Sequence, residues 1–108
     1  MSTNTPDSWV VVRLTTSRTS IDKVLAGWYG GYLDGDSWKL SSGIMSTEEF
    51  DDRYEFTNHS GSVYVCYKSR ERMSGIMAMQ YSYYEEMFAK HNTEHEAGAA
   101  IEVVPYNQ

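Results

Sequence analysis

Two histidines near the end of the chain have the spacing of a metal site. His91 and His95 stand four residues apart, which puts two imidazoles on one face of a helix. A zinc site uses three or four protein ligands, and neither another histidine nor Cys66 stands near the pair in the sequence. The sequence therefore predicts a solvated helix end, where histidines face the negative end of the helix dipole, and no metal or other cofactor.

Cys66 is the only cysteine, so the chain forms no internal disulfide and a reducing, cytoplasmic compartment is predicted. A nucleophilic cysteine needs a base and a group that orients the base, and His59 is the one candidate base nearby. No nucleophile signature surrounds Cys66, which favours a packed thiol within a strand. The chain also contains no phosphate loop, dinucleotide fingerprint or triad, so we predict no catalytic residues and a protein that is not an enzyme.

The whole chain has a net charge of −6, and its acidic side chains are concentrated before and after the middle of the sequence. This acidity repels phosphate groups and makes direct nucleic-acid binding an unfavourable reading. The run lacks the alternation and the turn glycine of a calcium loop. We predict either a solvated acidic turn or a protein-binding patch, in its stronger form a mimic of DNA. The patch consists of Asp34, Asp36, Glu48, Glu49, Asp51 and Asp52.

Aromatic residues gather in a glycine-rich stretch over 26–38. Their rings either close the end of the core or form a stacking platform for a base or a sugar. Two further tyrosines, Tyr81 and Tyr83, fall off the apolar stripe of the predicted helix and suggest a protein-binding surface. The candidate aromatic surface comprises Trp28, Tyr29, Tyr32, Trp38, Tyr81 and Tyr83.

The elements that must position these groups form one domain over 9–106, preceded by a disordered tail over 1–8. A β-branched run predicts a strand over 9–15 that is buried on both faces. Residues 20–29 are predicted to pair back on it as a strand, with a short helix as the alternative, and 46–52 as a single helical turn. Further strands are predicted over 37–44, 54–58, 63–68 and 100–105, the last of these at an edge.

Helical periodicity begins after residue 69 and predicts one long helix over about 70–92, with Ser69 as its cap. Its inner stripe is predicted to contain Met73, Ile76, Met77, Gln80, Tyr84, Met87 and Phe88. The order β-β-β-β-β-α-β then indicates an α+β fold, with an antiparallel sheet of five or six strands packed by that helix. No apolar run reaches the roughly 20 residues that span a bilayer.

Four segments carry a resemblance to a known group of proteins: WVVVR over 9–13, AGWYGG over 26–31, DSWKLSSGI over 36–44 and SGSVY over 60–64. They resemble small uncharacterised proteins encoded by tailed bacteriophages. The resemblance implies action in an infected bacterial cytoplasm, by binding a host protein and blocking or redirecting it. It implies no catalytic residue.

Three functions therefore stand as expectations. The first is a non-enzymatic accessory protein that binds a host bacterial protein through the acidic patch or the tyrosine-bearing helix. The second is a small-molecule or nucleotide site lined by the aromatic residues of 26–38. The third is a homo-oligomeric structural protein, built on the edge strand over 100–104 and the outer helix face.

Overall fold

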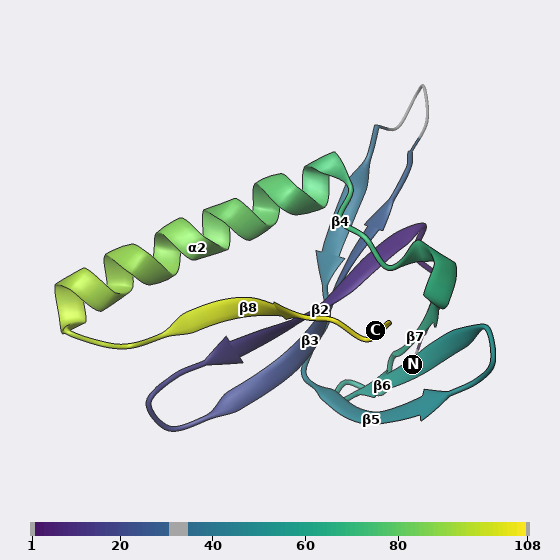
Figure 1. The fold of residues 1–108 in the computed structure, drawn as a ribbon, viewed down its shortest axis with the longest axis horizontal. Helices are drawn as coiled ribbons and strands as arrows, with labels where there is room; N and C mark the ends of the chain where they lie inside the picture. The colour runs from purple at the N-terminus through teal and green to yellow at the C-terminus, as the bar shows by residue number, and fades with distance from the viewer. Residues whose placement is uncertain (1, 31–34, 108) are drawn as a thin grey trace.

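The computed structural model describes residues 2–30 and 35–107. They form three layers: two four-stranded sheets packed face to face, and one long helix over the outer face of one of them (Figure 1). The expected α+β class and single long helix are confirmed, whereas the single sheet is wrong because the strands divide between two sheets. The strands are β1 (Thr3–Asn4), β2 (Ser8–Thr15), β3 (Ser20–Trp28), β4 (Ser37–Leu40), β5 (Ile44–Glu49), β6 (Arg53–Asn58), β7 (Val63–Tyr67) and β8 (Ala100–Val104); a 3₁₀ turn, η1, spans Lys68–Arg70, and the helix is α2 (Gly75–His95).

The central sheet, in the order β4-β3-β2-β8, has apolar side chains on both faces. Val11 and Val24 are register partners that face the second sheet, whereas Val10, Val12 and Leu25 pack toward the helix. A strand covered on both sides is apolar at successive positions rather than at alternate ones. The predictions of a doubly buried strand over 9–15, and of a strand rather than a helix over 20–29, are both confirmed.

The second sheet, in the order β1-β7-β6-β5, meets the central sheet through an aromatic core. The ring centroid of Trp9 lies 6.0 Å from Tyr54 and 5.8 Å from Phe56, and its Nε1 donates to the carbonyl of Tyr67 at 2.7 Å. Tyr106, which follows β8, places its ring 5.2 Å from the rings of both Tyr54 and Phe56. The C-terminal residues therefore close one side of the sandwich.

Two short segments differ from their predictions. Residues 46–52, predicted as a helical turn, contain most of β5, which is antiparallel to β6 with a register shift between Ile44 and Ser46. An isolated helical turn is costly to nucleate, whereas a strand beside β6 gains a ladder of hydrogen bonds. Residues 1–8, predicted as a tail, include β1, which pairs in parallel with β7, and Pro6 and Ser8 are buried.

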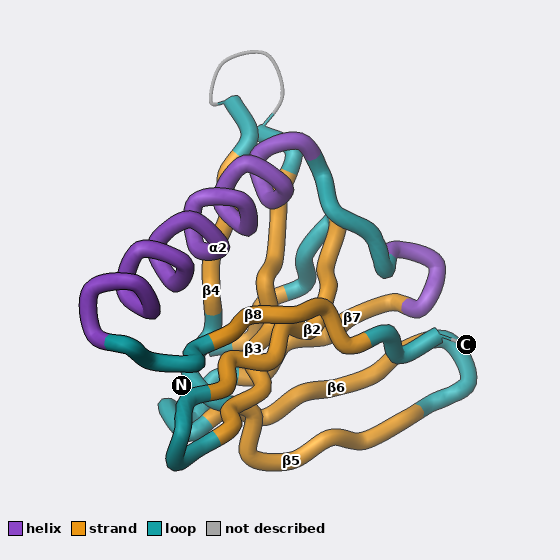
Figure 2. Tube along the Cα trace, turned by 60° about the vertical axis from the view of Figure 1, so that its left-hand side comes forward, coloured by secondary structure: helices purple, strands orange, loops and turns teal. Residues whose placement is uncertain are grey.

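The predicted strand over 37–44 is divided between the two sheets (Figure 2). Residues up to Leu40 belong to β4 in the central sheet, and Ile44 begins β5 in the other. Ser41 makes the crossing: its hydroxyl accepts from the Val24 N–H at 2.8 Å, and its own N–H donates to the Val24 carbonyl at 2.9 Å. These two bonds satisfy the backbone where the chain leaves the sheet.

The helix begins later and ends later than the sequence predicted. Residues after η1 run extended, with the Arg72 N–H donating to the Trp9 carbonyl at 3.0 Å, and Ser74 rather than Ser69 is the N-cap. At the other end, the Asn92 side chain exchanges two hydrogen bonds with Ala99, at 2.7 and 2.8 Å, and this leads the chain into β8. Within the described residues, no helix has the length and apolarity to cross a bilayer.

Gly27 sets how closely α2 approaches the central sheet. A Cβ at this position would lie 2.6 Å from Sδ of Met77, the one fully buried side chain of the helix. Met77 can contact β3 only because residue 27 is glycine, since nothing larger than a hydrogen atom fits between its backbone and Met77. This contact fixes which face of α2 points inward.

Candidate functional site

The two histidines lie where the sequence predicted, on the exposed last turns of α2. Their ring centroids are 4.7 Å apart. Among residues 2–30 and 35–107, no group of three or more histidine, cysteine or acidic side chains is placed to hold a metal ion. The pair remains a solvated helix end in this geometry.

Cys66 and His59 are not brought together. Cys66 points into the inter-sheet core, fully buried, and burial raises the pKa of its thiol far above the ordinary value. Its register partner on β6 is Tyr54, which stands five residues before His59, or about 16 Å along a strand. The thiol is thus neutral and has no base beside it, as expected for a packing residue.

The acidic patch is divided by the fold. β5 and the turn after it contain Glu48, Glu49, Asp51 and Asp52, whereas Asp36 precedes β4 in the other sheet. Figures 1 and 2 both show the start of β4 far from the turn between β5 and β6. Asp34 falls outside the described residues. The sequence left open whether these acidic segments converge in space, and among the described residues they do not form one patch.

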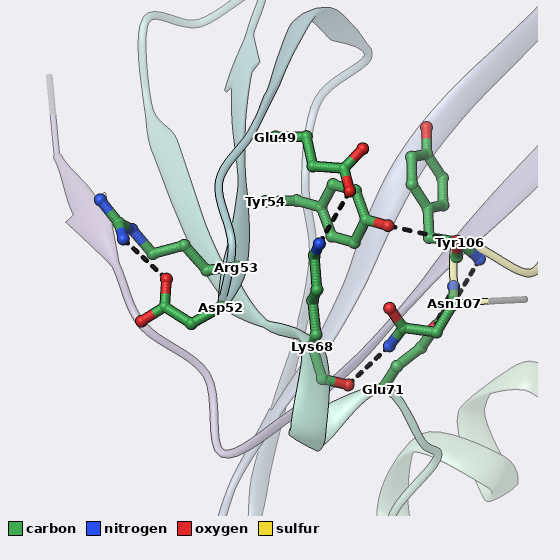
Figure 3. A network of polar contacts seen from close by, with 8 residues as sticks. All are labelled: Glu49, Asp52, Arg53, Tyr54, Lys68, Glu71, Tyr106 and Asn107. Carbon is green, nitrogen blue, oxygen red and sulfur yellow. Dashed lines mark hydrogen bonds and ion pairs between the residues drawn. The ribbon is translucent and has the colours of Figure 1, made fainter.

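Two of the four carboxylates around the β5–β6 turn are already ion-paired, as Figure 3 shows. Glu49 accepts from Lys68 Nζ at 2.7 Å and Asp52 from Arg53 at 2.8 Å. The hydrogen bond to Glu49 raises the pKa of Lys68, whose ammonium also lies 5.1 Å from the ring centroid of Tyr54. This turn offers fewer free charges to a partner than its composition indicates.

The described aromatic residues of 26–38 do not form one platform. Trp28 and Trp38 are on neighbouring strands but face opposite sides of the central sheet, because Trp38 is the register partner of Gly27 rather than of Trp28. Trp28 packs against the inter-sheet core, and Trp38 lies 6.3 Å, centroid to centroid, from Tyr84 of the helix. Tyr29 is half exposed, and its hydroxyl lies 2.9 Å from the hydroxyl of Ser8. This hydrogen bond lowers the pKa of Tyr29. Tyr32 lies outside the described residues.

The faces of α2 differ in two positions from the prediction. Tyr81, expected to point away from the core, packs inward, donates to the Ile101 carbonyl at 3.3 Å, and has its pKa raised by burial. Met87, expected on the inner stripe, is 45% exposed. The cause is Met77: once it is seated against Gly27, residues four, seven and eleven positions later (Tyr81, Tyr84 and Phe88) turn toward the sheet, and Met87 turns to the side.

The outer face of α2 carries a line of large apolar side chains. Met79, Tyr83 and Met87 stand four residues apart and are 74%, 55% and 45% exposed. Beside them the helix surface is hollowed, with a volume of about 420 Å³, because the neighbouring side chains are small. The hollow is lined by Gly75, Ala78, Met79, Ser82, Tyr83 and Glu86.

A second hollow, of about 430 Å³, opens between the sheets, and sequence reasoning did not find it. Arg13 and Asp22 line this hollow, and the guanidinium of Arg13 donates to both carboxylate oxygens of Asp22, at 2.8 and 3.1 Å. This pairing raises the pKa of the Arg13 guanidinium. Thr47, His59 and Tyr106 complete its polar wall. The sequence did hold a signal for this pair. By strand alternation, Arg13 and Asp22 occupy positions that face inward, where a charged side chain is unusual unless it is paired.

No protein-family model matches the chain, and neither a curated protein nor a solved structure similar to it was found.

Proposed function

We propose that this chain is a non-enzymatic protein-binding module whose docking surface is the outer face of α2. The observation that carries the proposal is the exposed line of Met79, Tyr83 and Met87. A solvated helix face is ordinarily polar, and a line at i, i+4 and i+8 is the pattern by which a helix enters an apolar groove. Tyrosine and methionine are also enriched at protein interfaces.

The rigidity of the helix supports this role. Met77 against Gly27 anchors its first turns, and the Tyr81 and Asn92 hydrogen bonds hold its middle and end to β8 and the loop before it. A helix that is ordered before binding loses little conformational entropy on docking. The phage-type resemblance makes a host bacterial protein one kind of partner for such a surface.

The test compares retained proteins for three forms of the chain. Tagged wild type, in concentrated bacterial lysate that also contains an untagged copy of this chain, is expected to retain a protein, either the copy or a host protein. A variant with Met79→Ser, Tyr83→Ser and Met87→Ser is expected to retain it at least about tenfold less, because buried aromatic anchors carry most of the binding energy. All three side chains are exposed, so the fold should be unchanged by circular dichroism.

The matched control reverses charge away from the helix, with Glu48→Lys and Asp51→Lys. If the retained protein is lost with the control and kept with the helix variant, binding occurs through the acidic hairpin and the proposal is wrong. A wild type that retains no protein at low or high salt and also stays monomeric at about 1 mM refutes it as well.

A further inference from the structure

We infer that the outer face of α2 is occupied by a second copy of this chain, paired antiparallel across a two-fold axis. This inference rests on the proposed function, because it names the occupant of the same face. It is argued from the shape of that face and from the arrangement of charge along it.

The hollow on α2 has the composition of a knobs-into-holes surface. In such packing, one side chain enters a hole formed by residues i, i+3, i+4 and i+7 of the facing helix. Gly75, Ala78, Met79 and Ser82 are one such set, and Met79, Ser82, Tyr83 and Glu86 are the next. Together they are the six residues that line the hollow. Three of the four members of the first hole are small, so this hole has the most room for a side chain of the facing helix.

The knobs that fit these holes are on the same face. Met79 and Tyr83 protrude, and their spacing of four residues equals the spacing of the two holes. One antiparallel arrangement therefore seats both: Tyr83 of the second copy enters the hole with the small residues, and Met79 of the second copy enters the other. The two-fold axis then passes between Gln80 and Tyr81. A symmetric contact of this kind repeats each interaction twice.

Charge along the helix favours the antiparallel direction. Arg72 is exposed and precedes the N-terminus of α2, whereas Glu85 and Glu86 are exposed one turn or more beyond the axis. Antiparallel pairing brings Glu86 to Gly75 of the second copy, at the positive end of its helix dipole and near its Arg72. A parallel pairing would instead place the like-charged glutamates side by side.

The contact runs over 75–87, about 18 Å of helix, which is short for an interface between folded proteins. It belongs to the weak class that buries less than about 1,200 Å² in total. We therefore expect a reversible dimer that forms between about 10 µM and 1 mM and dissociates on dilution.

Sedimentation equilibrium over that concentration range measures the association. Ala78→Arg fills the hole that Gly75, Ala78, Met79 and Ser82 form and is expected to abolish the dimer, while Glu86→Lys is expected to weaken it about 3- to 30-fold, because the helix-end contact is made twice. Both residues are exposed, so thermal unfolding of the monomer serves as the fold control. Glu48→Lys, the same substitution at an exposed position of β5 in the other sheet, is the matched charge control and should leave the association within about threefold of wild type.

Disulfide trapping tests the direction. In the antiparallel arrangement, the two copies of Ser82 are offset by only about 4 Å along the helix, whereas the two copies of Thr93 are about 37 Å apart. Under mild oxidation Ser82→Cys should form a covalent dimer and Thr93→Cys should not, and wild type is a silent background because Cys66 is fully buried. Cross-linking of Thr93→Cys would show a parallel pair and overturn the inference, whether or not Ser82→Cys also cross-links, because a parallel pair places both residues opposite their own copies.

The outcomes separate this inference from the proposed function. A chain that stays monomeric at 1 mM, yet retains a host protein through Met79 and Tyr83, overturns the inference and leaves the proposed function intact. A monomer that retains no protein overturns both. A concentration-dependent dimer that Ala78→Arg abolishes supports both.

Discussion

Replacing Gly27 by alanine perturbs the contact that seats α2 on the central sheet. The new methyl group would lie 2.6 Å from Sδ and 2.9 Å from Cγ of Met77, whose side chain is fully buried. Overpacking of this kind costs about 1–3 kcal/mol, offset by about 0.4–1 kcal/mol because alanine restricts the unfolded chain. We expect a net loss of about 1–2 kcal/mol in the free energy of unfolding, or about 5–10 °C in Tm.

A double-mutant cycle isolates the contact. Met77→Ala alone should cost about 2–5 kcal/mol, because it leaves a cavity. In the Gly27→Ala background it should cost about 1 kcal/mol less, because the added methyl group fills part of that cavity. Both free energies are measured by urea unfolding. Gly98→Ala is the matched control, since a Cβ there meets nothing within 4 Å. A Gly27→Ala variant as stable as wild type, or a cycle that is additive within about 0.3 kcal/mol, would refute the reasoning.

Two other predictions concern the chain end and pH. The carboxylate of Glu71 accepts hydrogen bonds from the N–H groups of Tyr106 and Asn107 at 2.7 and 2.8 Å (Figure 3). Glu71→Ala should therefore destabilise the fold by about 1–3 kcal/mol and speed hydrogen exchange at both amides. Unchanged exchange at these amides would contradict this prediction. Burial raises the pKa of Cys66, Tyr64, Tyr81 and Tyr106, so each binds its proton more tightly in the folded state. Their stabilisation is complete below the ordinary pKa values of 9.0 for the thiol and 10.0 for the phenols, and it is lost as the pH rises above them. The urea midpoint should therefore fall between about pH 9 and 11, and Cys66→Ala, although less stable at pH 7, should show a shallower fall; an identical slope would exclude the thiol as a contributor.

The long elements were predictable because their signals are local. Three successive valines indicate a strand buried on both faces, the polar turn before residue 20 favours pairing of 20–29 back on 9–15, and the hairpin of β6 and β7 follows from alternation about a turn. The division into two sheets was not predictable, because nothing in 37–44 shows that the chain leaves one sheet at Ser41 and enters another at Ile44. That step depends on backbone bonds between distant strands.

The candidate site shows the same limit. Helical periodicity predicts which residues share a face of the helix, but it gives the direction in which that face points only to a few tens of degrees. A rotation of that size about the helix axis is enough to turn Tyr81 toward the core and Met87 toward solvent. The direction is fixed by one close contact, Met77 on Gly27, between residues fifty positions apart. The hollow between the sheets depends likewise on Tyr106, which reaches it only because the chain end is clamped by Glu71.

The pairing of β2 with β8 determines when this protein can fold during its synthesis. Val11 and Val104 are register partners, so β2 is completed only by β8, a strand made about 90 residues later. Until β8 and the residues after it have left the ribosome, β2 has an open edge, and the aromatic core lacks Tyr106. An open edge beside a run of valines is a template for other chains. Synthesis of β8 is therefore the event that permits the central sheet to close, and the rate at which β8 reaches β2 sets how long a newly made chain remains prone to aggregation.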